Sequence, residues 1–377
     1  MRNKNVGEMM KAQLVVFGNI NNDGRAMRMQ YALMMYYKVV VSSSYSNNKI
    51  SFFNFEVERN RYLRHIIIFL KSVKIALREK PDLIVAENFY SLFSAVFIGK
   101  ILHIPIVYDA YELIIPGSFI YFSLRDKFWY WIERCCIRYV DLVIAANSYR
   151  EKKMKDHYIL TNTISVSNFT DPSKWKYNRE YENIPILNNK NEYKIIYQGD
   201  ICIERGIIRF IDSMRYLDNT RLLLVGSGID EESIRIHIIA NGLEKKVTLL
   251  GFVPTNNLHQ VTKKCHIGII CYPYKGLNNI FCAPNKIFEY AQSGLPVLST
   301  NQPPLENWIS KYKIGKTLPE EYSARQIAEI IKNMLRENKD YKAEISNFLK
   351  NENNINEKER LIFEIEKLNK RNFIING

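Results

Sequence analysis

Short apolar runs rich in β-branched residues alternate with longer amphipathic segments along the first half of the chain. The runs lie at residues 14–17, 83–86, 106–109, 142–145 and 164–166, and the segment 59–80 between two of them has helical periodicity. Apolar runs separated by amphipathic helices are typical of βαβ units, whose strands form a parallel sheet. The pattern therefore predicts a first α/β domain.

The same alternation starts again after a polar stretch at residues 171–192, with apolar runs at 193–197, 221–225, 247–250, 267–271 and 297–299. We expect two Rossmann-like, doubly wound parallel-sheet domains, at residues 1–175 and 190–345, that face each other across a cleft. A charged helical tail at 346–377 is expected to pack back on the first domain. Such sheets bind ligands at the carboxyl ends of their strands, so the loops after the strands should carry the function.

Length and composition agree with this organisation. A chain of 377 residues is long enough for two domains, and 47% hydrophobic with 24% charged residues excludes a disordered or fibrous protein. The longest apolar stretch, 92–108, contains Lys100, His103 and Pro105, which favours a helix followed by a strand over a membrane span. The polar start, residues 1–11, predicts no signal peptide and a cytoplasmic protein. The six cysteines form no Cys-x-x-Cys pair, so we expect neither zinc nor disulfides.

The net charge of +14 suggests an anionic partner: nucleic acid, an acidic membrane surface or a phosphate-bearing ligand. Most of this excess, +10, lies in residues 1–190. There, apolar residues 66–70 are flanked by Arg59, Arg61, Arg64, Lys71, Lys74, Arg78 and Lys80, and residues 119–130 add Phe122, Phe128 and Trp129 with Arg125 and Lys127. Basic segments of this kind suit an anionic membrane surface, and core helices would explain the apolar faces equally well. Nucleic acid is disfavoured because no recognition motif is present.

Three strands of the second half are expected to end in glycine-containing loops. Their sequences are Tyr197-Gln198-Gly199-Asp200, followed by Glu204-Arg205-Gly206, then Leu224-Val225-Gly226-Ser227-Gly228, and Gly251-Phe252-Val253-Pro254. Such corners offer backbone N–H groups to a phosphate, Arg205 would add a charged donor, and the last loop is apolar enough to contact a base. Each loop alone is equally compatible with an ordinary turn, a solvated arginine or buried packing.

The most specific stretch covers residues 283–298. Pro284 suits the first turn of a short helix, Gly294 suits its exit, and Val297 begins a strand. Lys286 and Glu289 are three residues apart and so share one helix face, where a cation near a phosphate and a carboxylate near a ribose could reach one ligand. An ordinary helical ion pair is the alternative.

Taken together and in this order, the motifs resemble those of bacterial glycosyltransferases of the GT-B fold, most closely family 4, the retaining group 1 transferases. The first half resembles the family more loosely, through Pro81-Asp82-Leu83-Ile84, Pro105-Ile106-Val107-Tyr108-Asp109, Ile132-Glu133-Arg134 and Val140-Asp141-Leu142-Val143-Ile144. The resemblance implies a UDP- or GDP-linked sugar donor on the C-terminal domain and a glycan or polyprenyl-linked acceptor on the N-terminal one. It further implies surface polysaccharide synthesis, such as lipopolysaccharide or capsule, at the inner face of the plasma membrane, with no metal or cofactor.

The resemblance also assigns residues. Glu289 takes the ribose hydroxyls, while Arg205 and Lys286 stabilise the departing diphosphate, which itself takes the acceptor proton in the retaining mechanism usually proposed. Glu112 is a further candidate for the active site. The remaining donor-binding candidates are Gly18, Gly199, Gly226, Gly228, Phe252, Val253, Cys282, Ala283 and Asn285.

Three departures from the family pattern limit this transfer. Phe281 stands where many relatives carry a first glutamate, Asp200 where many carry an arginine, and Asp109-Ala110-Tyr111-Glu112 where many carry Asp-x-His-Glu. Arg25 or Arg28 after the first strand could bind an anionic acceptor, although solvated helix arginines would look the same. The alternatives to a transferase are a GT-B-like sugar-nucleotide epimerase and a basic membrane-binding protein without activity.

Overall fold

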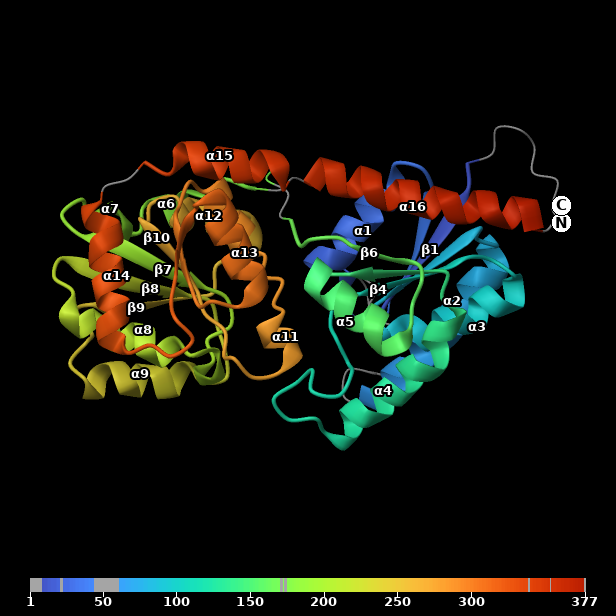
Figure 1. Cartoon of the computed structure of the whole chain (residues 1–377), viewed down its shortest axis with the longest axis horizontal. Helices are drawn as coiled ribbons and strands as arrows, with labels where there is room; N and C mark the ends of the chain where they lie inside the picture. Colours follow the sequence, from blue (N-terminus) through green and yellow to red (C-terminus); the bar gives the residue numbers. More distant parts are fainter. Residues whose placement is uncertain are drawn as a thin grey trace. The chain divides into compact units, whose positions relative to one another are not determined.

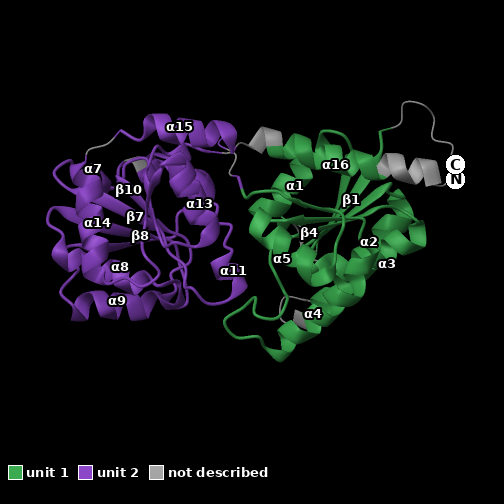
Figure 2. Ribbon diagram, viewed as in Figure 1, with its two compact units in different colours: residues 1–168, 355–377 green, residues 169–354 purple. Residues whose placement is uncertain are grey.

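The structure, a computed structural model, describes residues 9–20, 23–43, 61–169, 172, 175–337, 340–352 and 354–375. It divides into two compact units (Figure 2): unit 1 comprises Met1–Asn168 and Ile355–Gly377, and unit 2 comprises Phe169–Asn354. The second unit thus begins earlier than residue 190, because Phe169 and Leu187 already belong to its hydrophobic core. Arg59 and the middle of the loop between Gly18 and Arg25 lie outside the described residues.

Unit 1 is built on a six-stranded parallel sheet (Figure 1). Across the sheet the strands are β2 (Lys38–Ser43), β1 (Lys11–Val16), β3 (Leu83–Glu87), β4 (Ile106–Ala110), β5 (Leu142–Ala145) and β6 (Thr163–Ser165). β3, β4 and β5 are buried along their whole length, as the continuous apolar runs predict. The edge strand β2 was not predicted.

The helices of unit 1 cover both faces of this sheet. They are α1 (Gly24–Met34), α2 (Arg61–Glu79), α3 (Phe89–Leu102), α4 (Leu124–Cys136), α5 (Ser148–Tyr158) and, from the end of the chain, α16 (Asn354–Ile375). One core cluster joins α1 and α16 to the sheet, with Leu361 and Ile365 of α16 fully or almost fully buried. α2, α3 and α4 lie side by side away from α1 and α16, with α3 packed between the other two (Figure 1).

Unit 2 is a second six-stranded parallel sheet with a different strand order. Its strands are β12 (Gly315–Thr317), β11 (Val297–Ser299), β10 (Ile267–Ile270), β7 (Tyr193–Gln198), β8 (Thr220–Val225) and β9 (Val247–Gly251). The direction of winding reverses between β7 and β10, and such a reversal opens a ligand-binding crevice at the carboxyl ends of the two strands. The short edge strand β12 was not predicted.

Two layers of helices complete unit 2. One core cluster packs α8 (Ile207–Ser213), α9 (Glu231–Ala240) and α14 (Ala324–Arg336) on the sheet. The other packs α10 (Thr255–Thr262), α12 (Lys286–Gln292), α13 (Pro303–Tyr312) and α15 (Lys342–Asn351). The shorter helices are α6 (Arg179–Glu182), α7 (Pro185–Asn188) and α11 (Leu277–Ile280). Among the described residues, no helix combines the length and apolar character that a membrane crossing requires.

The segment 283–298 differs in one detail from the prediction. α12 begins at Lys286 with Asn285 as its N-cap, so Pro284 precedes the helix and does not lie in its first turn. Gly294, with a φ of +79°, follows the end of the helix as expected. Tyr290 anchors α12 to the crevice strands, because its buried hydroxyl lies 3.0 Å from the carbonyl oxygen of Ile269 in β10 and 3.3 Å from that of Ile196 in β7.

Candidate functional site

The crevice of unit 2 brings two cationic side chains to one aromatic ring. Tyr272 follows the end of β10, and the Arg205 guanidinium lies 4.8 Å from its ring centre. The Lys286 ammonium lies 5.7 Å from the same ring and 5.2 Å from the ring of Tyr197 at the end of β7. Two residues 81 positions apart in the sequence therefore place their charges at one point, where the strand order reverses.

Neither cation is neutralised by a carboxylate of the described part of the chain. The printed hydrogen bond of Arg205 goes from Nη1 to the neutral Oδ1 of Asn279, at 3.1 Å. Lys286 forms no ion pair with any residue that the structure describes, so the alternative of a helical pair with Glu289 is not realised. Burial, and then the charge of Arg205, lower the pKa of Lys286. Two adjacent cations in a partly desolvated crevice favour an anionic ligand.

Two glycines of this crevice are needed because a side chain would not fit at their positions, and their N–H groups are already hydrogen-bonded. Gly199 has a φ of +124°, and a Cβ there would lie 2.8 Å from Lys286 Cε. Gly226 has a φ of +142°, and a Cβ there would lie 1.9 Å from the carbonyl oxygen of Gly199. The N–H of Gly199 donates to Val225 and that of Gly226 to Gly251, at 2.8 and 2.9 Å. These two N–H groups are therefore not available to a phosphate as the sequence suggested.

A chain of hydrogen bonds orients the carboxylate of Glu289. Gln198, buried at the end of β7, donates from Nε2 to Glu289 Oε2. Its Oε1 accepts a bond of 3.0 Å from the hydroxyl of Thr262 in α10. Because the amide of Gln198 is held from the other side by Thr262, the carboxylate of Glu289 is fixed next to the crevice. The sequence motif contains Gln198 but does not reveal this role, which depends on residues 64 and 91 positions away.

The remaining candidates in unit 2 divide into surface and core residues. Phe252 is 69% exposed just after β9, where a planar ligand could lie against its ring. Val253 and Cys282 lie in the hydrophobic core, so their side chains are not available and only their backbone could contact a ligand. Ala283 and Asn285 are partly buried, and Gly228 lies in the loop after β8, where a Cβ would lie 2.1 Å from the carbonyl oxygen of Ile201.

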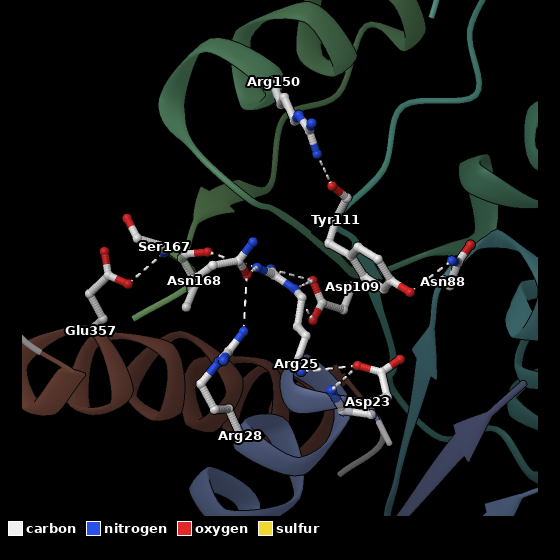
Figure 3. Close-up of polar contacts among 12 residues, drawn as sticks. Asp23, Arg25, Arg28, Asn88, Asp109, Tyr111, Arg150, Ser167, Asn168 and Glu357 are labelled. Atoms are coloured by element: carbon white, nitrogen blue, oxygen red, sulfur yellow. Dashed lines mark hydrogen bonds and ion pairs between the residues drawn. The ribbon is translucent and has the colours of Figure 1, made fainter. Parts of the chain in front are cut away.

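At the carboxyl edge of the unit 1 sheet, the candidate cation is already neutralised (Figure 3). Arg25 of α1 bonds Asp109 of β4 through Nε, at 2.8 and 3.0 Å, and through Nη2, at 2.6 Å. Its Nη1 donates to Asn168 Oδ1 at 2.7 Å. Arg25 is 8% exposed, so it is neither a solvated helix arginine nor a free site for an anionic acceptor. Arg28 also donates to Asn168, at 3.2 Å, and burial followed by the charge of Arg25 lowers its pKa to about 10.

A second acid lies beside this pair. Glu87, at the end of β3, is in register with Asp109 and is buried. Neither of its carboxyl oxygens has a hydrogen-bond partner among the residues that the structure describes. Burial, and then the charge of Asp109, raise the pKa of Glu87 well above its usual value, which favours its uncharged form. Sequence motifs offered no signal for it.

The other candidates of unit 1 lie at the same edge. Gly18 follows β1 with a φ of +125° and accepts a hydrogen bond from the Ser43 hydroxyl at its carbonyl. Tyr111 stands where relatives carry a histidine, and its hydroxyl accepts a bond of 3.0 Å from Asn88 Nδ2. Glu112 is partly buried after β4. The edge thus presents acids, an amide and a phenol, with its nearest arginine already paired.

Two doubly wound parallel units, the second with a cationic crevice at its switch point, define the class of the GT-B fold. Residues 178–351, nearly the whole of unit 2, match the family described as glycosyl transferases group 1. This part of the chain is therefore similar to that family, as the motifs indicated.

Solved structures confirm the fold over both units. Sucrose-phosphate synthase from Thermosynechococcus elongatus is similar with a TM-score of 0.71 and 14% identity, over 95% of this chain and 99% of that one. Anabaena Alr3699/HepE, crystallised with UDP-glucose, gives 0.70 and 15% over 95% and 100%. WaaG, a glycosyltransferase involved in lipopolysaccharide biosynthesis, gives 0.64 and 16% over 90% and 94%. No curated protein matches the sequence.

Proposed function

We propose that this protein is a glycosyltransferase whose unit 2 holds a nucleoside diphosphate sugar. The observation that carries the proposal is the pair of cations, Arg205 and Lys286, that face Tyr272 without an ion-pair partner among the described residues. A diphosphate is the anion that suits two such cations beside an orienting carboxylate. The match of residues 178–351 to the group 1 family supports the same proposal.

Each side chain has a distinct role in this proposal. Arg205 and Lys286 bind the diphosphate, and each charged hydrogen bond contributes about 1.5–3 kcal/mol. Since negative charge grows on the diphosphate as the sugar leaves, the same two cations stabilise the transition state more than the bound donor. Glu289, oriented by Gln198, accepts hydrogen bonds from the ribose hydroxyls. The cations take the place of a metal ion, so the reaction is proposed to need none.

The donor is proposed to carry UDP, with GDP as the alternative. The crystal structure of the Anabaena protein with UDP-glucose supports uridine. Reaction with retention of configuration follows the resemblance to retaining transferases: the leaving phosphate takes the acceptor proton on the face that the acceptor attacks. Unit 1 would then hold the acceptor, with Glu112 and Tyr111 as residues that position it.

The acceptor is proposed to be a glycan or a polyprenyl-linked sugar in surface polysaccharide synthesis, reached at the inner face of the plasma membrane. The role of WaaG in lipopolysaccharide biosynthesis supports this class of product. The charge of +10 in residues 1–190 supports an anionic surface as the place of the reaction.

A thermal-shift panel of UDP, GDP, CMP and their sugars tests the donor. Stabilisation by a nucleoside diphosphate in the wild type, lost in Lys286→Ala and kept in the exposed control Lys263→Ala, supports the proposal. No response to any nucleotide contradicts it. The anomer of the product then decides retention, and conversion of the donor sugar to its epimer without an acceptor would instead identify an epimerase.

A further inference from the structure

The three neighbouring helices α2, α3 and α4 of unit 1 each carry a row of solvent-exposed apolar side chains. On α2 the row is Leu63, Ile66, Leu70 and Leu77, at spacings that keep one face of a helix. The opposite face, with Ile68 and Ala76, is buried. α2 therefore has two apolar faces, of which the fold of unit 1 uses one.

The rows on α3 and α4 continue the one on α2. On α3 the exposed residues are Phe93, Phe97 and Ile101, and on α4 they are Leu124, Phe128 and Trp131. Phe69 of α2 links the first two helices, since its ring centre lies 5.7 Å from that of Phe93 and 5.1 Å from that of Phe97. α3 packs against both α2 and α4. We call the ten exposed residues, which are 39 to 82% accessible, the α2–α4 face.

Cations lie within these rows. Lys74 continues the row of α2, Lys100 adjoins Ile101 on α3, and Lys127 and Arg134 flank Trp131 on α4, all with exposed side chains. Lys100 lies 4.6 Å from the ring of Tyr139. The face therefore combines apolar bulk with positive charge along each helix.

The few acids of the three helices do not offset this charge. Glu133 is fully buried between the hydroxyls of Tyr108 and Tyr158. Asp126 is engaged as the capping box of α4 with Ser123. Glu79 pairs with Arg78 and Lys11. An exposed apolar surface with a clear excess of cations remains.

We infer that the α2–α4 face docks on an anionic lipid bilayer, with its apolar rows in the interfacial layer and its lysines and arginines at the lipid phosphates. This combination of apolar and cationic side chains is what an anionic interface binds, and Trp131 is of the residue type favoured at that depth. A second copy of the chain is a poorer occupant, because two such faces would oppose like charges. The inference deepens the proposed function, since it names the surface that would bring unit 1 to a membrane-bound acceptor.

The α2–α4 face differs in its residues from the basic and aromatic segments that the sequence indicated for membrane binding. Trp129, a candidate of the sequence, packs against His65 and Tyr90 with ring centres 4.6 and 4.9 Å apart. Lys71 donates to the carbonyl of Ser43 at 2.9 Å. Neither belongs to the docking face. α3 contributes three apolar residues and Lys100 that the charge pattern of the sequence did not indicate.

Co-sedimentation of the full chain with vesicles tests the inference. We expect binding to vesicles of phosphatidylcholine with phosphatidylglycerol, weakened by added salt, and little binding to phosphatidylcholine alone. The triple variant Ile66→Gln, Leu70→Gln, Leu77→Gln should bind about tenfold more weakly or worse, because three inserted apolar side chains are lost. The matched control Ile229→Gln, Ile236→Gln, Ile239→Gln changes three isoleucines of unit 2 that are at least as exposed and lie beside the acids Glu231 and Glu232. It should bind like the wild type.

Other outcomes would overturn the inference. They are no binding by the wild type, equal binding to both kinds of vesicle, or no effect of the α2 triple variant. A dimer that the same variant abolishes, seen by analytical ultracentrifugation, would assign the face to a second copy. The nucleotide response separates this test from the proposed function: the α2 triple variant should keep its thermal shift with UDP, and Lys286→Ala should keep its binding to vesicles.

Discussion

The two units carry arginines at the same edge of similar sheets, but these arginines face opposite surroundings. In unit 1, Arg25 makes several hydrogen bonds to the buried carboxylate of Asp109. In unit 2, Arg205 faces the ring of Tyr272 and an amide, next to the second cation Lys286. Arg25 is neutralised by an ion pair within unit 1. Arg205 faces a neutral amide and an aromatic ring, so its positive charge can bind an anionic ligand.

This difference shows why fold alone does not place the anion site. Both sheets are parallel and both reverse their winding, in unit 1 between β1 and β3 and in unit 2 between β7 and β10. Both crevices therefore have the geometry that commonly binds ligands. The side chains decide: unit 1 lines its edge with Glu87 and Asp109, and unit 2 lines its crevice with Arg205 and Lys286.

The largest contrast should come from removing each arginine. Arg25→Ala leaves Asp109 buried without its cation, and we expect a loss of about 3–5 kcal/mol in the free energy of unfolding of unit 1, measured by urea denaturation. Arg205→Ala in unit 2 breaks no ion pair and should cost less than about 1 kcal/mol. The exposed control Lys152→Ala should have almost no effect. Equal losses for the two arginine variants would remove the distinction.

The sequence predicts most of the strands and helices of both units. It predicts little of the difference between the surroundings of Arg25 and Arg205. Continuous apolar runs such as 83–86 and 142–145 identify strands because parallel strands are buried on both faces. β12, with only Gly315–Thr317, has no such run and is a strand only because it pairs with β11. The pairing of Arg25 with Asp109 joins residues 84 positions apart, and no local pattern encodes that distance.

The candidate site was predicted more fully in unit 2 than in unit 1. Arg205, Lys286 and Glu289 are local to recognisable loops and a short helix, so motifs find them. Gln198 and Tyr272 complete the site through contacts between strands that are distant in the sequence. The raised pKa of Glu87 could not be predicted, because it depends on burial and on Asp109 in the neighbouring strand.

Removal of Lys286 tests whether the cations of unit 2 serve ligand binding and not the stability of the fold. Lys286→Ala should weaken the binding of UDP about 10- to 100-fold, because one charged hydrogen bond to the diphosphate is lost. Stability in the absence of nucleotide should be unchanged or slightly higher, since burial disfavours this charge, as the lowered pKa indicates. Isothermal titration calorimetry and urea denaturation measure the two effects. Unchanged affinity for UDP would exclude Lys286 from the site.

The buried acids of unit 1 should give that unit a distinctive pH dependence. Burial raises the pKa of Glu133 from its usual value near 4.5 to about 7. The folded state therefore keeps a proton that the unfolded state loses, and this contribution to stability is complete below pH 4.5 and is lost as the pH rises through 7. We expect a decrease of about 1 kcal/mol or slightly more per pH unit between pH 5 and 7.

Glu133→Gln tests this pH dependence. Its amide oxygen still accepts a hydrogen bond from Tyr108, and the slope of unfolding free energy against pH should become shallower. Some slope should persist, because Glu87 has a raised pKa and contributes with the same sign. A slope identical to that of the wild type would show that Glu133 is already ionised in the folded protein at these pH values.

The smallest effect is expected for Glu289, which is proposed to recognise the ribose and not to neutralise the diphosphate. Glu289→Ala should weaken UDP binding about tenfold without unfolding unit 2, because one charged contact to the ribose is lost while both cations remain. The loss should be specific: the wild type should prefer UDP to 2′-deoxy-UDP, and the variant should bind both alike. Glu289→Gln keeps an acceptor oxygen and should retain part of the preference. If Glu289→Ala preserves the full preference, the ribose is bound elsewhere, and the hydrogen bond from Gln198 only holds α12 to the end of β7.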